Sequence, residues 1–213
     1  MRYYPICLDL KDRAVLVVGG GTIAEGKILQ LVEAAARVLV VSPTLTERLS
    51  EMVEQRLITH RCAEFSEDDL DGALLVISAT DNQAVNEAVA KAAALRGRLC
   101  NVVDQPALCN FITPALVTRG ALQISISTGG GSPSLAQRVK REIAELIGEE
   151  YGELLELAAE LRREVHRVLP DFNSRRDLLK AFVESDALKL LRAGKPDEAR
   201  ELARQMLHPK RED

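Results

Sequence analysis

The 213-residue chain has no tryptophan, and aromatic residues make up only 3% of it. A large flat ligand would therefore have to be held mainly by aliphatic side chains, backbone groups and charges. No apolar run approaches the about 20 residues that span a membrane, and the N-terminal stretch MRYYPICLDLKDR is broken by Pro5 and Asp9. We expect a cytoplasmic protein that has no membrane partner.

The four cysteines, Cys7, Cys62, Cys100 and Cys109, form no CxxC pair and have no companion histidines at zinc-ligand spacing. This pattern predicts neither a disulfide framework nor a metal site, so we expect small apolar residues in a reducing compartment. The net charge is −4, which provides no electrostatic footprint for nucleic acid. The sequence therefore predicts no bound metal and no nucleic-acid partner.

Short aliphatic runs alternate with helical patterns over the first 113 residues. The strand-like runs are 14–18, 37–41, 57–62, 73–78 and 99–103, and the helix-like segments are 22–34, 46–57 and 82–95. Strands nearly free of polar residues, each separated by a helix, predict a parallel sheet covered on both faces. The fold class is therefore α/β, a Rossmann-like doubly wound sheet, with Thr44 as the expected N-cap of the second helix.

The pattern changes after residue 113. Residues 115–127 predict two extended runs joined by a turn, and the following GGGSP predicts a helix with Ser132 as its N-cap. From residue 150 onward only helical patterns follow, and charged residues become denser. We expect a doubly wound domain over 1–113, a small mixed segment over 114–149 and a helical C-terminal domain over 150–213.

The run VVGGGTIAEGK follows the first strand and opens the first helix. Gly19 permits a tight turn, Gly21 lets the backbone approach a diphosphate, and Ala24 takes the place of the third glycine of GxGxxG. The free N–H groups of Thr22 and Ile23 would face the diphosphate at the positive end of the helix dipole. This strand-turn-helix context predicts a dinucleotide site.

The second strand ends in Ser42-Pro43-Thr44, without the acidic residue expected there. Ser42 and Thr44 can hydrogen-bond an adenosine ribose, but they do not exclude a 2′-phosphate by charge repulsion. We place Ser42, Pro43 and Thr44 in the cofactor site. Spacing alone leaves the choice between NAD and NADP open.

Two further segments follow strands of the predicted sheet. Thr80 and Asp81 come after the fourth strand, and Asp104 comes after the fifth. Ligands of doubly wound sheets bind outside the carboxyl ends of the strands, so we expect all three at the ligand edge. The plain alternative for Asp104 is a turn residue ahead of Pro106.

Five blocks, VVGGGTIAEGK, VVSP, SATDN, NVVDQPALCNFITPA and ISTGGGSPSLA, follow one another along the chain. In these blocks the chain resembles the precorrin-2 dehydrogenase / sirohydrochlorin ferrochelatase family of siroheme synthesis, without the methyltransferase domain of some relatives. The resemblance implies NAD as cofactor, a tetrapyrrole substrate and a homodimer with a dimerisation segment at 114–149. It also implies that activity depends on Asp104.

Oxidation of precorrin-2 to sirohydrochlorin passes a hydride to the nicotinamide and releases a proton, so a carboxylate beside the nicotinamide suits a general base. We expect Asp104 to be partly buried, because desolvation strengthens a carboxylate as a base. If ferrous iron is also inserted, iron is a substrate and not a bound cofactor. A dehydrogenase without chelatase activity and a non-catalytic nicotinamide-sensing module are the alternatives.

A substrate with many carboxylates needs cations and helix N-termini around it. The candidate substrate contacts are Asn101, Arg119, Thr128, Gly129, Ser132 and Arg138. For the glycine-rich turn at 128–132, the bare start of a helix is an equal alternative.

Two positions depart from the pattern common in relatives. Gly26 replaces an arginine in the first helix, and Ala35 replaces a glycine at the end of that helix. We therefore expect a different C-cap at Ala35.

Overall fold

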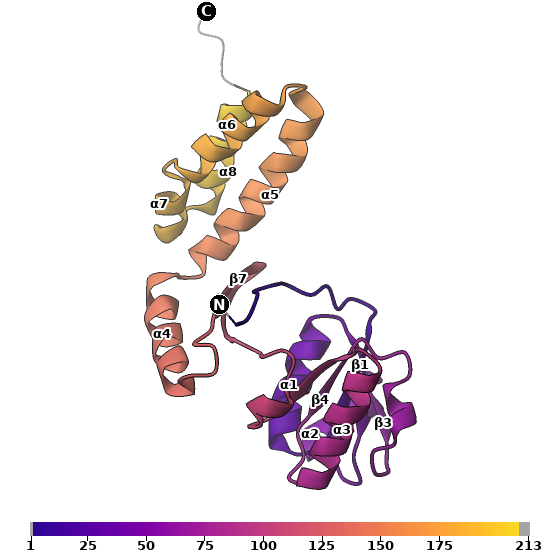
Figure 1. Ribbon diagram of the computed structural model, residues 1–213. Helices are drawn as coiled ribbons and strands as arrows, with labels where there is room; N and C mark the ends of the chain where they lie inside the picture. The colour runs from indigo at the N-terminus through magenta and orange to yellow at the C-terminus, as the bar shows by residue number, and fades with distance from the viewer. Residues whose placement is uncertain (1, 209–213) are drawn as a thin grey trace, which may run out of the picture. The chain divides into compact units, whose positions relative to one another are not determined.

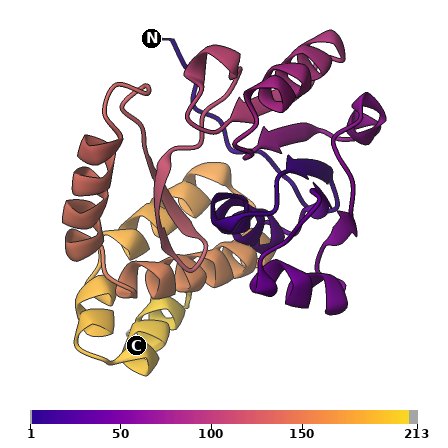
Figure 2. The same cartoon turned by 90° about the horizontal axis from the view of Figure 1, so that it is seen from below.

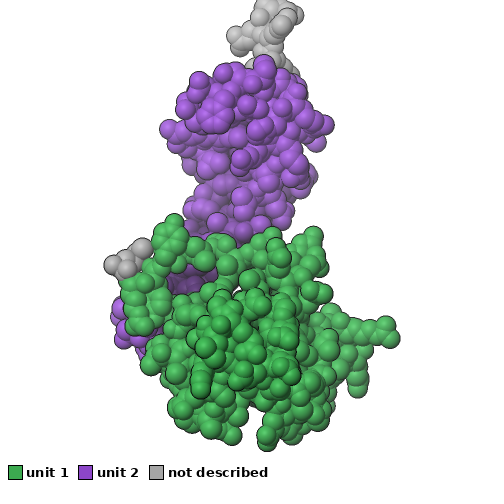
Figure 3. Space-filling view, turned by 45° about the vertical axis from the view of Figure 1, so that its right-hand side comes forward, with its two compact units in different colours: residues 1–113 green, residues 114–213 purple. Residues whose placement is uncertain are grey.

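The computed structural model describes residues 2–208 (Figure 1). It divides into two compact units, unit 1 over Met1–Thr113 and unit 2 over Pro114–Asp213, which Figure 3 colours separately. Unit 1 contains two clusters of buried apolar side chains and unit 2 contains one. Each unit therefore has a core of its own.

Unit 1 is built on one parallel sheet. Its strands are β1 (Ala14–Val18), β2 (Arg37–Val41), β3 (Thr59–Arg61), β4 (Leu75–Ser78) and β5 (Leu99–Val102). Their spatial order is β3-β2-β1-β4-β5, and every pairing is parallel. The doubly wound prediction is confirmed, and the order reverses between β1 and β4, where the ligand crevice of such sheets lies.

Helices cover both faces of this sheet. They are α1 (Thr22–Glu33), α2 (Glu47–Glu54) and α3 (Gln83–Leu95), with short 3-10 turns η1 (Glu67–Leu70) and η2 (Pro106–Leu108). Val15 and Val17 of β1 pack with α1, whereas the alternate residues Leu16 and Val18 pack with α3. Figures 1 and 2 show the helices flanking the strands, as the strand periodicity requires.

The N-cap of α2 differs from the prediction. Thr46, not Thr44, is the capping residue, and its hydroxyl accepts a hydrogen bond from the Leu49 N–H at 3.2 Å. The same hydroxyl donates to the Glu25 carboxylate of α1 at 2.6 Å. The Thr46 hydroxyl therefore joins the starts of two helices, whereas the sequence pattern favoured Thr44 two residues earlier.

The end of α1 keeps the backbone of a glycine cap without the glycine. Ala35 has φ 56°, its N–H bonds to the Val32 carbonyl, and the Ala36 N–H bonds to the Leu31 carbonyl. These two bonds define a Schellman motif, whose left-handed residue is usually glycine. The expectation of a different C-cap is wrong, because the alanine itself adopts the left-handed conformation.

Unit 2 contains one antiparallel hairpin and five helices among its described residues. The hairpin pairs β6 (Ala115–Arg119) with β7 (Leu122–Ile126), and the helices are α4 (Pro133–Leu146), α5 (Glu150–Val168), α6 (Phe172–Val183), α7 (Ala187–Arg192) and α8 (Pro196–Leu207). Ser132 caps α4 as predicted, since its hydroxyl accepts from the Leu135 N–H. The predicted hairpin and helical tail are confirmed.

The hairpin is held closely by α5. A Cβ atom at Gly152 of α5 would lie 2.7 Å from the carbonyl oxygen of Arg119, at the end of β6. A contact of that length is closer than a side chain allows. Glycine at position 152 therefore permits the helix to pass against the hairpin.

The cysteines do not share one environment. Cys100 is buried and Cys109 is half-buried, whereas Cys7 and Cys62 are exposed, so the prediction of small apolar residues is wrong for the last two. Burial, aided by the neighbouring Cys109, raises the pKa of the Cys100 thiol to about 11, so this thiol stays protonated at neutral pH. Over residues 2–208, no cluster of three His, Cys, Asp or Glu side chains is suited to a metal ion. No helix of the described chain has both the length and the apolar character to cross a membrane.

Candidate active site

The glycine-rich loop between β1 and α1 is fixed by close backbone contacts. Gly19 has φ 118°, and a Cβ there would lie 2.3 Å from the carbonyl oxygen of Ala79 after β4. A Cβ at Gly20 would lie 2.1 Å from the carbonyl oxygen of Thr44 after β2. Gly19 thus makes the predicted tight turn, and Gly20 is a second obligatory glycine that the sequence analysis did not single out.

Gly21 differs from its neighbours, because a Cβ there would meet no atom within 4 Å. It is the N-cap of α1 and provides no side-chain cap, so the N–H groups of Thr22 and Ile23 have no capping side chain. Ala24 is fully buried against the sheet, as the third position of GxGxxG requires. Open backbone, an uncapped helix start and a small buried residue together fit the diphosphate of a dinucleotide.

The loop after β2 lies against this glycine-rich loop. The Thr46 N–H donates to the Gly20 carbonyl at 3.0 Å. Ser42 is 8% exposed, and its carbonyl is 2.9 Å from His60 Nε2, while the Cys62 thiol donates to the Pro43 carbonyl at 3.4 Å. These bonds hold Ser42 and Pro43 beside the glycines, where the sequence predicted the ribose side of the cofactor.

An arginine next to this loop is already paired. Arg61, the last residue of β3, makes a bidentate ion pair with Asp69 and donates to the Glu64 carbonyl at 2.7 Å. Its guanidinium is therefore occupied and is not presented to a 2′-phosphate.

The segment after β4 is positioned by a buried asparagine. Asn86 of α3 accepts a hydrogen bond from the Ser78 hydroxyl at 2.7 Å and donates to the Thr80 carbonyl at 3.0 Å. Both Ser78 and Asn86 are buried. Asp81 is exposed beside Thr80. Sequence reasoning missed Asn86, although a polar residue among the apolar positions of α3 was a usable signal.

Asp104 stands two residues beyond the end of β5, and the Val103 N–H still bonds to the Ser78 carbonyl of β4 at 2.9 Å. Its φ is 58°, a left-handed conformation that aspartate tolerates better than most residues. Its side chain is exposed and makes no hydrogen bond within the described residues, so the expected partial burial is wrong. The free carboxylate is therefore available to a ligand at this edge of the sheet.

The segment after Asp104 folds back against β5. The Cys100 N–H donates to the Asn110 side chain at 2.7 Å, which in turn donates to the Arg98 carbonyl at 2.8 Å. The Asn101 amide donates to the Phe111 carbonyl at 3.1 Å, and the Val102 N–H donates to the Cys109 sulfur at 3.1 Å. These bonds fix the loop that carries Asp104.

Asn101 was expected to contact substrate, and this geometry gives it a different role. Its side chain is 8% exposed, and its amide nitrogen is used by the Phe111 carbonyl and the Cys109 sulfur. The donor group of Asn101 therefore holds the loop, and a substrate contact of Asn101 stays a prediction.

Lys27 of α1 reaches the same edge, and the sequence analysis did not select it. Its ammonium donates to the Thr113 hydroxyl at 2.9 Å. The side chain is half-buried, and this burial lowers the pKa of Lys27, an effect that the nearby Asp104 charge partly opposes. The Asp104 charge therefore acts on the Lys27 ammonium within unit 1.

Arg119 in unit 2 is fully engaged by backbone. Its guanidinium donates to the carbonyls of Ala144 and Ile147 at 2.8 Å each, and it lies 3.4 Å from the Glu149 carboxylate. These are the last carbonyls of α4, which otherwise lack partners. The structure gives Arg119 a helix-capping role, and its binding of substrate carboxylates stays a prediction.

The turn before α4 likewise uses its own hydroxyls. The Thr128 hydroxyl accepts from the Ser132 N–H and donates to the Ser132 carbonyl, and Gly129 has φ 64°. Since Thr128 and Ser132 hydroxyls both have local partners, the structure favours the helix-start interpretation of this turn. Arg138 is exposed and pairs with Glu142 one turn along α4, so its substrate role stays a prediction.

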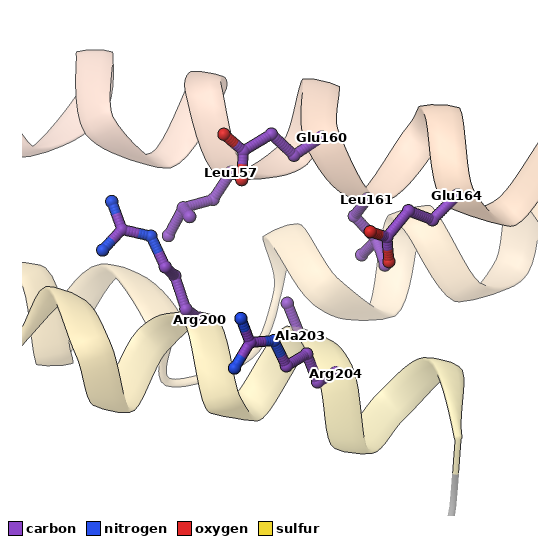
Figure 4. A pocket seen from close by; sticks show the side chains of 7 residues that line it. All are labelled: Leu157, Glu160, Leu161, Glu164, Arg200, Ala203 and Arg204. Atoms are coloured by element: carbon purple, nitrogen blue, oxygen red, sulfur yellow. The ribbon is translucent and has the colours of Figure 1, made fainter.

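Unit 2 also has a shallow pocket of its own between α5 and α8 (Figure 4). Its lining is Leu157, Glu160, Leu161, Glu164, Arg200, Ala203 and Arg204. Both arginines have acidic partners on their own helix, Asp197 and Glu201. None of the sequence-predicted site residues lines this pocket.

Three protein-family models match consecutive parts of the chain. Residues 6–115 match the family described as Putative NAD(P)-binding, and residues 119–146 match Sirohaem biosynthesis protein central. Residues 150–207 match Sirohaem synthase dimerisation region. That description assigns dimerisation to the helical part, whereas the sequence analysis had assigned it to 114–149.

Curated relatives and a solved structure give the same family. A siroheme synthase from Thioalkalivibrio sulfidiphilus is 40% identical over 201 residues, which are 94% of this chain and 41% of that protein. One from Methylococcus capsulatus is 39% identical over 199 residues, 93% of this chain and 42% of that protein. The structure of SirC, precorrin-2 dehydrogenase, has a TM-score of 0.81 and 30% identity, covering 95% of this chain and 100% of its own.

The chain thus spans less than half the length of the curated relatives but the full length of the solved one. The matches extend over both units and include the glycine-rich loop and the Asp104 segment. The chain belongs to the precorrin-2 dehydrogenase and siroheme synthase family.

Proposed function

We propose that this protein oxidises precorrin-2 to sirohydrochlorin with NAD as the oxidant. The observation that carries the proposal is the exposed Asp104 carboxylate, without a hydrogen-bond partner in the described chain, beyond β5 of a dinucleotide-binding sheet. A sheet of this order binds its cofactor beyond β1 and β4, and β5 is the next strand outward. The name of the solved relative, precorrin-2 dehydrogenase, supports the same reaction.

Each part of the site has a defined task in this reaction. A bound nicotinamide would supply the hydride acceptor of this reaction. Gly19, Gly20 and Gly21 shape the diphosphate cradle, and the uncapped start of α1 stabilises the diphosphate charge. Asp104 accepts the proton that leaves the macrocycle, because its carboxylate is exposed and has no hydrogen-bond partner among the described residues.

NAD fits the residues better than NADP. The 2′-phosphate of NADP needs a free cation near the end of β2. Arg61, on the strand next to β2, is paired with Asp69, and Ser42 and Thr44 are neutral. The carboxylate of Glu25, bound to Thr46 at the start of α2, adds negative charge near that loop.

We extend the proposal to insertion of ferrous iron into sirohydrochlorin as a second reaction of the same site. Metal insertion releases two pyrrole protons. The exposed Asp104 carboxylate can accept the first, pass it to solvent water and then accept the second. Iron is a substrate in this reaction.

We also propose a cytoplasmic homodimer. The match of residues 150–207 to a dimerisation region supports the dimer, and the use of free NAD supports the location. The tetrapyrrole is the only partner that the proposed reaction requires besides NAD.

An anaerobic assay tests the main proposal. Precorrin-2 and NAD are mixed with the protein, and sirohydrochlorin formation is followed by absorbance. We expect turnover in the native protein, loss of at least about 100-fold in Asp104→Ala, and NAD affinity within twofold of native, because general base catalysis contributes 10²–10⁴-fold.

The outcomes separate the candidate functions. Absence of turnover in the native protein, with NAD binding retained, favours a nicotinamide-sensing module. Loss of NAD binding in Asp104→Ala makes this residue a cofactor ligand. A second assay with sirohydrochlorin and ferrous ion separates a dehydrogenase without chelatase activity from a bifunctional enzyme, by comparison with the uncatalysed rate.

A further inference from the structure

Lys27 lies near enough to Asp104 for the carboxylate charge to act on its ammonium. It lies on α1, five residues after the helix begins at Thr22. Its ammonium is anchored by the Thr113 hydroxyl at 2.9 Å, across 86 positions of sequence. The segment from Asp104 to Thr113 therefore carries both the proposed base and the hydroxyl that binds this lysine.

The Lys27 ammonium has no anionic partner in direct contact. Residues 2–208 contain twelve ion pairs, and none of them includes Lys27. Glu25, the nearest acid along α1, is bound to Thr46. A half-buried ammonium without a contacting anion is costly, since burial removes water from the charge.

The ammonium also retains hydrogen-bonding capacity. A protonated lysine has three N–H donors, and the Thr113 hydroxyl uses one of them. Two donors therefore remain for an anion. The reduced pKa of Lys27 is what burial without a contacting anion produces, and a bound anion would raise this pKa again.

The position of Lys27 favours an anion on the substrate over the cofactor diphosphate. The diphosphate is expected at the N–H groups of Thr22 and Ile23, and five residues of helix move Lys27 about 7 Å along the axis. The bond to Thr113 and the charge of Asp104 place Lys27 on the side of the proposed base.

We propose that the Lys27 ammonium binds a carboxylate of the tetrapyrrole and so seats the macrocycle beside Asp104. This inference rests on the proposed function, because it takes a polycarboxylate tetrapyrrole as the ligand. Lys27 then supplies the cation that the sequence analysis sought in Arg119, which is occupied by the end of α4.

Binding measurements on the full chain test this role directly. Sirohydrochlorin and NAD are titrated separately against the native protein, Lys27→Met, Lys27→Arg and Lys91→Met. Lys91 is an exposed lysine on α3 and serves as the matched control. Removal of one charged hydrogen-bond donor is expected to weaken sirohydrochlorin binding about tenfold and to leave NAD affinity within twofold.

Further results are expected if the positive charge of residue 27 binds sirohydrochlorin. Lys27→Arg should recover most of the sirohydrochlorin affinity, and Lys91→Met should not alter it. The KM for precorrin-2 should rise about tenfold in Lys27→Met while kcat changes less than threefold. Lys27→Gln keeps a polar side chain without the charge and should show a similar loss of sirohydrochlorin affinity, which keeps the test valid if Lys27→Met does not fold.

Other results overturn it. Weaker NAD binding with unchanged sirohydrochlorin binding in Lys27→Met would make Lys27 a cofactor ligand. A fall in kcat with unchanged KM would mean that Lys27 acts through Asp104 alone. Native protein that oxidises precorrin-2 normally, with Lys27→Met equally active, refutes this inference only, whereas inactive native protein refutes the proposed function.

Discussion

The two units differ in what their polar groups do. In unit 1, the start of α1, Lys27 of α1 and the loop after β5 leave backbone N–H groups, an ammonium and a carboxylate without full partners. In unit 2, Arg119, Thr128 and Ser132 bond to helix ends and turns of the same unit. Groups that remain unpaired at the edge of a rigid sheet are the ones available to a ligand.

The comparison shows that one sequence motif can have two meanings. GGGT in unit 1 and TGGGS in unit 2 are both glycine-rich helix starts. In the first, the N-cap is Gly21, which has no side chain to cap α1, whereas the second ends in Ser132, whose hydroxyl caps α4. A helix start that supplies its own cap has less capacity left for an anion.

The largest effect is expected from a substitution in the glycine-rich loop of unit 1. Gly19→Ala places a Cβ 2.3 Å from the Ala79 carbonyl oxygen at φ 118°. We expect a loss of about 3 kcal/mol or more in the free energy of unfolding, and no measurable NAD binding. Denaturant unfolding and NAD titration measure both.

Gly21→Ala is the matched control, since its Cβ would enter open space. This variant should unfold within about 1 kcal/mol of native. If Gly19→Ala unfolds like Gly21→Ala, then the loop relaxes and the close approach to Ala79 is not a constraint.

The next effect tests whether Arg119 serves the fold of unit 2. Arg119→Met removes charged donors from the Ala144 and Ile147 carbonyls. We expect a loss of about 2–3 kcal/mol in the free energy of unfolding, because hydrogen bonds to charged groups contribute about 1.5–3 kcal/mol. Sirohydrochlorin affinity measured in the same protein should change less than threefold.

Arg138→Met is the control on the surface of α4, where the pair with Glu142 is exposed. Its unfolding free energy should stay within about 0.5 kcal/mol of native. A tenfold loss of sirohydrochlorin affinity in Arg119→Met without destabilisation would return Arg119 to the substrate site and remove the contrast between the units.

The smallest effect concerns stability within unit 1 away from the ligand edge. Ala35→Gly relieves a left-handed alanine in the Schellman motif at the end of α1. We expect a gain of about 1 kcal/mol, because the left-handed conformation costs a residue with a Cβ about that much. Thermal unfolding measures the gain, and unchanged NAD affinity shows that the ligand edge is not affected.

The strands and the loops that follow them were predictable from the sequence, because their signals are local. The apolar runs fixed the sheet, and strand-turn-helix spacing located Gly19 and Asp104 at one edge. The roles of Arg119 and Asn101 were not predictable, since their partners Ile147 and Phe111 lie far along the chain or in irregular loops. Charge and residue type alone cannot show whether a donor is already occupied.

The role of Lys27 was not predictable from the sequence for the same reason. Within α1 it has the spacing of an ordinary helix residue, and only the return of the segment to Thr113 brings it toward Asp104. The exposure of Asp104 was not predictable either. The left-handed turn at this residue leaves its side chain exposed.

The close contact between Gly152 and the Arg119 carbonyl has a consequence for the growing chain. A two-stranded hairpin is marginal in water by itself, although it forms within about 1–10 μs. At about 5–20 residues per second, synthesis needs roughly one to five seconds to pass from the end of β7 to Gly152. During that interval α4 is the only helix of unit 2 available to pack against the hairpin, and α5 follows it.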